Sequence, residues 1–206
     1  MADKKSHTNG DGKFFALLNR MKYINRWGLM KNLREESVAL HSIETAFIAH
    51  ALALIGNEYL GKTHDPDRVA AAALYHDATE ILTGDMPSPI KYMNAGIKQA
   101  YKDIEKNAAG ALAARLPPEL ARHYASYLGG LPEDAEVSGL IHAADKLCAY
   151  IKCTDELNAG NKEYELAARS IKKILDAMAA TLPELDYFMT RFLPAFSLTL
   201  DEYGGE

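Results

Sequence analysis

The chain has 206 residues, of which 48% are hydrophobic and 25% charged, a composition typical of a soluble globular protein with enough apolar side chains for a substantial core. Its formal net charge of −5 argues against a general binder of nucleic acid polymers or of anionic membranes, because such proteins use net or clustered positive charge to reach phosphates. A small anionic ligand is compatible with this charge, since a few local cations can hold it.

The N-terminus and the cysteines favour a cytoplasmic protein. The segment MADKKSHTNGDGK is polar and lacks the apolar run of a signal peptide, and no later stretch has the uninterrupted apolar length that spans a bilayer. Cys148 and Cys153 lie within one expected helix, where their separation disfavours a bridge, so we expect free thiols and a reducing compartment. We expect residues 1–12 to form a disordered tail and residues 13–206 to form one domain.

The hydrophobic pattern predicts helices along almost the whole chain. The first is expected from Ser37, a suitable N-cap, to about Tyr59, and the second from Pro66 until the segment TGDMPSP supplies a glycine and two prolines that end it. Further helices are expected at about 90–115, 118–128, 133–158, 164–180 and 182–200. Strand signals are weak and the interruptions are short, so the sequence predicts an all-α, single-domain helical bundle.

Adjacent His76 and Asp77 are the first candidates for a functional site, because this ionisable pair follows an almost wholly apolar stretch. Alone the dipeptide is weak evidence, since an isolated histidine is more often a hydrogen-bonded core or surface residue than a ligand. His41 and Asp145 strengthen it, because both lie in apolar helical surroundings where a buried polar group needs a partner. One divalent cation would satisfy all four, with nitrogen lone pairs from the imidazoles and oxygens from the carboxylates.

These four residues resemble the H…HD…D signature of the HD-domain phosphohydrolases. Longer segments resemble the bacterial YfbR-type 5′-deoxynucleotidases over almost the whole chain after the N-terminal tail. They are NRWGLM (25–30), YHDATEILTGDMPSPIKY (75–92), AADKLCAYIKC (143–153) and ELDYFM (184–189). The resemblance implies an all-α, HD-type helical bundle, usually a homodimer. It also implies hydrolysis of deoxyribonucleoside 5′-monophosphates with a divalent metal such as cobalt or manganese.

The same resemblance assigns roles to individual residues. The metal ligands would be His41, His76, Asp77 and Asp145, the catalytic carboxylates Glu80 and Asp85, and the substrate contacts Arg26, Trp27 and Asp85. Leu40 departs from the family pattern, because relatives commonly have an acidic residue immediately before the first ligand histidine. The missing acid could weaken the hydrogen bonding that orients His41 and so lower the affinity for metal. The shortage of further histidines between Asp77 and Asp145 favours one metal over two.

The two carboxylates outside the ligand set can support general acid–base chemistry. Glu80 follows His76 by one helical turn, so we assign it proton transfer; otherwise it would be a solvated glutamate near a helix end. Asp85, in the turn after the same helix, could hydrogen-bond the sugar or transfer a proton, and a purely turn-forming role explains it nearly as well. The sequence leaves the division of labour between them open.

Arg26 and Trp27 are adjacent and chemically suited to a nucleotide. Arg26 offers a charge-assisted fork to phosphate oxygens, and Trp27, the sole tryptophan, offers a flat wall that would crowd the sugar 2′ position and favour deoxyribose. Without the family, a surface salt bridge and core packing would explain them better. Two other functions stay open: an HD phosphohydrolase acting on another nucleotide, and a non-catalytic nucleotide sensor, against which the retained Glu80 and Asp85 argue.

Overall fold

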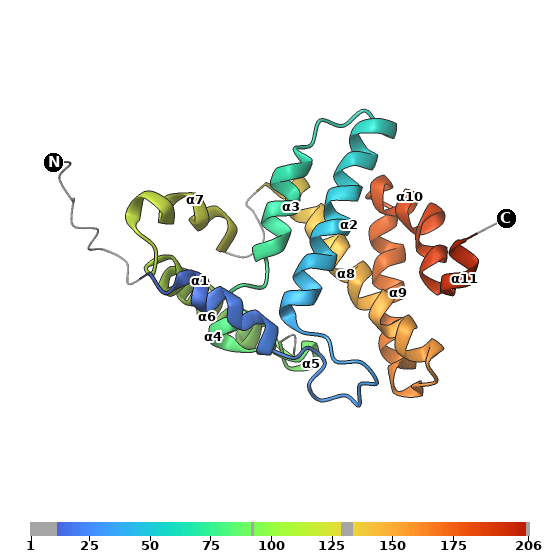
Figure 1. Ribbon diagram of the computed structural model, residues 1–206, viewed down its shortest axis with the longest axis horizontal. Coiled ribbons are helices and arrows are strands. Elements are labelled where there is room, and N and C mark those ends of the chain that lie inside the picture. Colours follow the sequence, from blue (N-terminus) through green and yellow to red (C-terminus); the bar gives the residue numbers. More distant parts are fainter. Residues whose placement is uncertain (1–11, 92, 129–133, 205–206) are drawn as a thin grey trace. The chain divides into compact units, whose positions relative to one another are not determined.

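The structure is a computed structural model that describes residues 12–91, 93–128 and 134–204, and residues 1–11 of the expected tail lie outside these ranges. Every regular element in the described part is a helix, and the only other pairing there is an isolated antiparallel bridge between Asn25 and Ser37 (Figure 1). The predicted all-α fold is therefore confirmed. The α-helices are α1 (Phe14–Leu18), α2 (Val38–Tyr59), α3 (Pro66–Tyr75), α4 (Glu80–Thr83), α5 (Ser88–Lys91), α6 (Ala95–Ala113), α7 (Pro118–Leu128), α8 (Ala135–Asn158), α9 (Glu165–Ala179), α10 (Pro183–Arg191) and α11 (Leu200–Tyr203). The 3-10 helices are η1 (Asn19–Tyr23), η2 (Lys162–Tyr164) and η3 (Leu193–Ser197).

The contacts of the chain group the described residues into two compact units. The first comprises residues 12–29, 36–42, 74–91 and 93–128, and the second comprises residues 30–35, 43–73 and 134–204. The predicted bounds of one domain, 13–206, stay a prediction.

The first unit is built around a cluster of buried apolar side chains from its helices and from the turn after α3. The cluster consists of Phe14, Met21, Val38, Ala78, Ala109, Leu112, Leu116 and Leu128. Each large side chain buried in this way contributes on the order of 1.5–3 kcal/mol. Val38 and Ala78 bear directly on the site, because they lie three residues before His41 and immediately after Asp77. Core packing therefore fixes the backbone that carries these two side chains.

Helix α2 begins as the sequence predicts, with Ser37 as its N-cap. The Ser37 Oγ accepts a hydrogen bond from the N–H of Leu40 at 3.2 Å. The helix is apolar around most of its circumference, and Ile43, Phe47 and Leu54 on it are exposed. By length and composition α2 could cross a membrane, but 56% of its apolar window is buried inside the structure. This burial favours a core helix, because core helices of soluble proteins pass the same compositional test.

The second predicted helix is interrupted, which corrects the sequence prediction at the site itself. Helix α3 ends at Tyr75 and α4 begins at Glu80, while residues 76–79 form a turn. In this turn the N–H of Ala78 donates to the carbonyl of Tyr75, and the N–H of Glu80 donates to that of Asp77, both at 3.0 Å. These bonds span three residues where those of an α-helix span four, so the backbone tightens and the side chains leave their helical spacing.

The second unit contains most of α2 and α3 together with α8 to α11, and α8 packs along α9 (Figure 1). The predicted helix at 182–200 is shorter than expected, because α10 ends at Arg191 and a 3-10 turn that contains Pro194 follows. Proline has no N–H to donate and its ring clashes with the preceding turn of an α-helix. Cys148 and Cys153 are buried on α8 and are not joined in a disulfide, as predicted.

A buried carboxylate on α8, that of Glu156, anchors the loop before α2. It accepts hydrogen bonds from the N–H groups of Leu33 and Arg34 at 2.9 and 3.0 Å and from Nδ2 of Asn161 at 2.7 Å, and it pairs with the Lys152 ammonium. Burial would raise the pKa of Glu156, but Lys152, Asn161 and the two N–H donors outweigh it and lower that pKa to about 2. Glu156 is thus a charged structural link between α8 and residues 30–35.

Candidate metal centre

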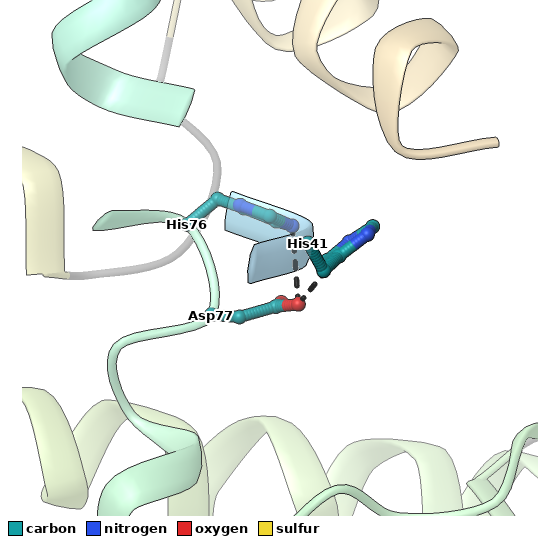
Figure 2. A group of neighbouring side chains, drawn as sticks. All are labelled: His41, His76 and Asp77. Carbon is teal, nitrogen blue, oxygen red and sulfur yellow. Dashed lines mark ion pairs between the residues drawn. The ribbon is translucent and has the colours of Figure 1, made fainter. Parts of the chain in front are cut away.

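Two backbone segments bring three of the predicted ligands together in the first unit. His41 is fully buried in the first turn of α2, and His76 and Asp77 lie in the turn that follows α3. The Nε2 atoms of His76 and His41 lie 3.1 and 3.6 Å from Oδ2 of Asp77 (Figure 2). The structure therefore joins residues that are 35 and 36 positions apart in the sequence.

This group fits a divalent cation. One ligand atom from each of the three side chains lies within 4.8 Å of the others. Metal bonds of about 2.0–2.2 Å to nitrogen and oxygen would hold ligand atoms roughly 3–3.5 Å apart, close to the distances around Asp77. Burial alone would raise the pKa of Asp77, but His76, His41 and Arg26 outweigh it, and that pKa lies well below its usual range. Asp77 is therefore available as an anionic ligand at neutral pH.

A carboxylate that the sequence reasoning missed lies behind His41. Oε1 of the buried Glu36 is 3.4 Å from Nδ1 of His41, the ring nitrogen that does not face Asp77. Metal-binding histidines commonly donate this second N–H to a carboxylate, which fixes the tautomer and the ring orientation. Leu40, where the family pattern has an acid, is exposed, whereas the Glu36 carboxylate lies beside the Nδ1 atom of His41. The only signal in the sequence is an acidic pair just before Ser37, which is typical of a solvated helix start.

The structure also brings Arg26 and Trp27, two of the three predicted substrate contacts, to this site. Nη1 of Arg26 lies 3.3 Å from Oδ2 of Asp77, and its Nε lies 3.1 Å from Oε1 of Glu36. The indole Nε1 of Trp27 donates to Oε2 of Glu36 at 3.3 Å. The Arg26 side chain is only 13% exposed, so the alternative of a surface salt bridge is wrong. Its cation lies between two carboxylates of the site.

Glu80 is buried at the start of α4, within electrostatic reach of Asp77 and Asp85. Its Oε2 is buried and has no hydrogen-bond partner among the described residues. Burial raises the pKa of Glu80 to about 9, and the charges of Asp77 and Asp85 add to the rise. A cation bound to Asp77 would offset the effect of the Asp77 charge on the pKa of Glu80, but it would not offset the effect of burial. Glu80 can therefore hold a proton near neutral pH, and the alternative of a solvated glutamate is wrong.

Asp85 lies in the loop after α4, where the N–H of Trp27 donates a hydrogen bond to its carboxylate. Burial raises the pKa of Asp85, and the charge of Asp77 adds to the rise, whereas Arg26, the Trp27 N–H and Lys91 oppose it. This contact ties Asp85 to the segment that carries the other two predicted substrate contacts, Arg26 and Trp27. A role limited to shaping its own turn does not account for that contact.

Asp145, the fourth predicted ligand, belongs to the second unit. It lies on α8, where Nζ of Lys146 is 3.0 Å from its Oδ2. The place of Asp145 in the ligand set stays a prediction.

An all-α fold that joins a helical histidine to an adjacent His–Asp pair defines the class of HD-type metal-dependent phosphohydrolases. The fold is similar to that of an HD-domain phosphohydrolase from Listeria innocua, with a TM-score of 0.77 and 20% identity over 91% of this chain and 89% of that chain. It is also similar to a cyanophage S-2L HD phosphohydrolase bound to dA and one catalytic Zn²⁺ ion, with a TM-score of 0.60 and 20% identity over 89% of this chain and 96% of that chain. These likenesses show a shared fold.

Sequence comparison narrows the class to a family. The family model described as 5′-deoxynucleotidase YfbR-like matches residues 13–196. A 5′-deoxynucleotidase of Pectobacterium atrosepticum is 49% identical over 189 residues, which are 92% of this chain and 94% of that protein. The 5′-deoxynucleotidase YfbR of Salmonella typhi is 46% identical over 199 residues, which are 97% and 96% of the two chains. The chain belongs to the YfbR-like 5′-deoxynucleotidase family, which confirms the predicted family and class of enzyme.

Proposed function

We propose that this chain hydrolyses deoxyribonucleoside 5′-monophosphates to deoxyribonucleosides and phosphate, with one divalent cation held by His41, His76, Asp77 and Asp145. The observation that carries the proposal is the convergence of two imidazoles on the Asp77 carboxylate, with the Arg26 guanidinium 3.3 Å from the same oxygen. The names of the curated relatives support the reaction. The phage phosphohydrolase bound to dA supports a deoxynucleoside at a site on this fold.

The phosphate is the first group that the site must manage. A phosphate monoester resists hydrolysis because its negative charge repels a nucleophile. A bound cation would supply charge neutralisation and lower the pKa of a coordinated water. Arg26 would orient the phosphate beside the ligands, because a guanidinium carries five N–H donors in a planar fork that matches phosphate oxygens.

Proton transfer is assigned to Glu80. Its burial and raised pKa let it carry a proton near neutral pH, and its Oε2 is available to a reacting group. Glu80 would give this proton to the departing 5′ oxygen of the sugar or receive one from the attacking water. Asp85 would contact the sugar or share in proton transfer, since the Trp27 N–H directs its carboxylate toward the substrate contacts.

The sugar selectivity is assigned to Trp27. Its indole is held by Glu36 next to Arg26, so a phosphate on Arg26 would bring the attached sugar within reach of the ring. A flat, fixed wall beside the 2′ carbon accepts deoxyribose and crowds the extra hydroxyl of ribose.

The metal, the oligomer and the compartment complete the proposal. Cobalt or manganese suits a site with imidazole and carboxylate donors. Because the phage phosphohydrolase binds a catalytic Zn²⁺ ion, the activity with zinc must be measured beside that with cobalt and manganese. The exposed apolar residues Ile43, Phe47 and Leu54 of α2 support a homodimer, because exposed apolar surface of this kind is commonly covered by a partner. Two buried cysteines that form no disulfide support a cytoplasmic protein.

A matrix of substrates and metals tests the proposed reaction. The chelated protein is reloaded with cobalt, manganese or zinc, and phosphate release is measured from dAMP, dGMP, dTMP, the matching ribonucleotides and a nucleoside triphosphate. We expect turnover of the deoxyribonucleoside monophosphates with cobalt or manganese. Inert monophosphates beside an active triphosphate would instead favour an HD phosphohydrolase for another nucleotide, and nucleotide binding without any turnover would favour a sensor.

A further inference from the structure

Glu36 is the residue at which the metal ligands and the substrate contacts meet. Its Oε1 lies 3.4 Å from Nδ1 of His41 and 3.1 Å from Nε of Arg26, and its Oε2 accepts the indole N–H of Trp27 at 3.3 Å. The Glu36 side chain is 6% exposed. One buried carboxylate therefore lies against a predicted metal ligand and two of the three predicted substrate contacts.

The backbone holds these partners in place as well. The N–H of Arg26 donates to the carbonyl of Glu36 at 2.9 Å, and the N–H of Val38 donates to that of Ile24 at 2.9 Å. The two segments thus pair as a short antiparallel bridge, with Val38 buried in the core of the first unit. The backbone of this bridge consequently holds Glu36 and Arg26 next to each other.

We propose that Glu36 is a positioning residue that couples the metal centre to the substrate contacts. This inference rests on the proposed function, which assigns Arg26 and Trp27 to the substrate. Glu36 orients His41 from one side of the site and places Arg26 and Trp27 from the other. A change at the metal centre therefore alters the positions of the substrate contacts, and a change at the substrate contacts alters the metal centre, because both contact the same carboxylate.

On the metal side, Glu36 sets the tautomer of His41. The anionic Glu36 carboxylate, 3.4 Å from Nδ1, favours the tautomer with its proton on Nδ1, and that tautomer leaves the lone pair of Nε2, 3.6 Å from Asp77, available to a metal. Partners of this kind typically affect metal affinity by about 10- to 100-fold. Glutamine would keep the size of the side chain, but it would replace one acceptor oxygen by an NH₂ group, which is a donor.

On the substrate side, Glu36 secures a strained residue. Trp27 has a φ of 58°, in the left-handed region that bulky side chains rarely adopt. Such a conformation persists only when surrounding contacts enforce it. The bond from the Trp27 indole to Glu36 and the bond from the Trp27 N–H to Asp85 are contacts of this kind. Loss of the bond from the indole to Glu36 would let the indole move away from its proposed position beside the sugar.

The sole tryptophan makes the coupling measurable without substrate. The emission of Trp27 is followed while chelated protein is titrated with Zn²⁺, which does not itself absorb or quench at these wavelengths. In the unmodified protein we expect the emission to change as Zn²⁺ binds, because His41 and Trp27 share Glu36. In Glu36→Gln we expect Zn²⁺ affinity to fall by about 10- to 100-fold and the emission response to be lost.

Glu35→Gln is the matched control, because it removes the neighbouring carboxylate, which is exposed. It should match the unmodified protein in Zn²⁺ affinity, emission and kinetics. For Glu36→Gln with dAMP we expect a raised KM together with a lowered kcat, since both the substrate contacts and the metal are affected. A folded Glu36→Gln with unchanged Zn²⁺ affinity and unchanged emission would overturn the proposal.

Trp27→Phe tests the coupling should Glu36→Gln fail to fold. Phenylalanine keeps a flat aromatic ring, although a smaller one, and lacks the N–H whose hydrogen bond Glu36 accepts. Co²⁺ affinity, read from the absorption of the bound metal, should change several-fold relative to the unmodified protein, whereas an unchanged affinity refutes the coupling. These readings need no turnover, so an unmodified protein that binds metal but does not hydrolyse dAMP would refute the proposed function alone.

Discussion

Nε2 of His76 lies 3.1 Å from Oδ2 of Asp77, although neighbouring side chains on an α-helix point about 100° apart. The two side chains meet because residues 76–79 leave the α-helix and form a turn whose bonds span three residues. One short segment thus supplies two candidate ligands, and only His41 has to be brought from elsewhere in the first unit. The geometry of the centre depends chiefly on this turn and on the start of α2.

The first prediction concerns the ligand set. Asp77→Ala and Asp145→Ala should each lower the affinity for Co²⁺ or Zn²⁺ by more than about 100-fold, because a lost ligand costs more than a lost outer partner. Calorimetric titration of the chelated proteins measures this, and circular dichroism confirms that the variants remain helical. Asp155→Ala, an exposed carboxylate on the same helix as Asp145, is the control. If Asp145→Ala binds metal as tightly as this control does, Asp145 leaves the ligand set.

The sequence predicted the helices well where proline or glycine marks their ends. Helix α7 runs from Pro118 to Leu128 as expected, because a proline opens it and a glycine pair follows it in the sequence. The break at 76–79 was not predictable in this way. That segment, His76 to Thr79, contains a helix-favouring alanine and neither proline nor glycine, and its turn is imposed by core packing of Ala78 and by the partners of Asp77.

The clustering of three candidate ligands was predictable from the sequence, whereas the carboxylate beside them was not. Three polar residues stand out in the sequence because their surroundings are apolar, and the structure brings them together: His41, His76 and Asp77. Glu36 gives no such signal, because it lies in a charged stretch before a helix and its partners come from another segment of the chain. Sequence periodicity reports which face of a helix is apolar, but not which carboxylate reaches across a bridge between two loops.

The second prediction concerns Glu80. Its raised pKa means that the folded protein binds a proton there which the unfolded chain releases at a lower pH. Chelated protein should therefore lose stability as the pH rises from the usual glutamate pKa through about 9. Glu80→Gln should remove this loss and raise the Tm at pH 8, by about 2–4 °C for each kcal/mol relieved. The same variant should lower kcat with dAMP by roughly 10²- to 10⁴-fold.

Glu58→Gln serves as the control for Glu80, since Glu58 is exposed near the end of α2. Differential scanning calorimetry of both variants across this pH range compares the slopes of Tm against pH. Equal slopes in Glu80→Gln and the unmodified protein would show that Glu80 titrates normally. Undiminished turnover in Glu80→Gln would remove Glu80 from proton transfer.

The third prediction separates two roles of Trp27. Trp27→Ala removes the flat wall, so the ratio of activity on dAMP to activity on AMP should narrow on the order of tenfold or more. Trp27→Phe keeps a ring beside the sugar and should retain most of the preference for deoxyribose. Steady-state kcat/KM values for both nucleotides measure the ratio. A ratio that stays the same in a folded Trp27→Ala would assign the selectivity to another residue.

The fourth prediction concerns the stability provided by Glu156, far from the proposed chemistry in sequence. Because its pKa is lowered to about 2 in the folded protein, its contribution is fully present above the usual glutamate pKa and disappears as the pH falls from there through about 2. Glu156→Gln should therefore lower the free energy of unfolding near pH 7 by about 1–3 kcal/mol, because the N–H groups of Leu33 and Arg34 lose a charged acceptor.

The sign of the pH dependence makes the test of Glu156 specific. Urea unfolding at several pH values should show the difference between Glu156→Gln and the unmodified protein shrinking as the pH falls from about 4.5 toward 2. Glu165→Gln, which removes an exposed carboxylate at the start of α9, should show no comparable difference at pH 7. A difference for Glu156→Gln that does not change with pH would mean that the charge of Glu156 does not help to hold residues 30–35 against α8, because a contribution from the charge must disappear as the carboxylate is protonated.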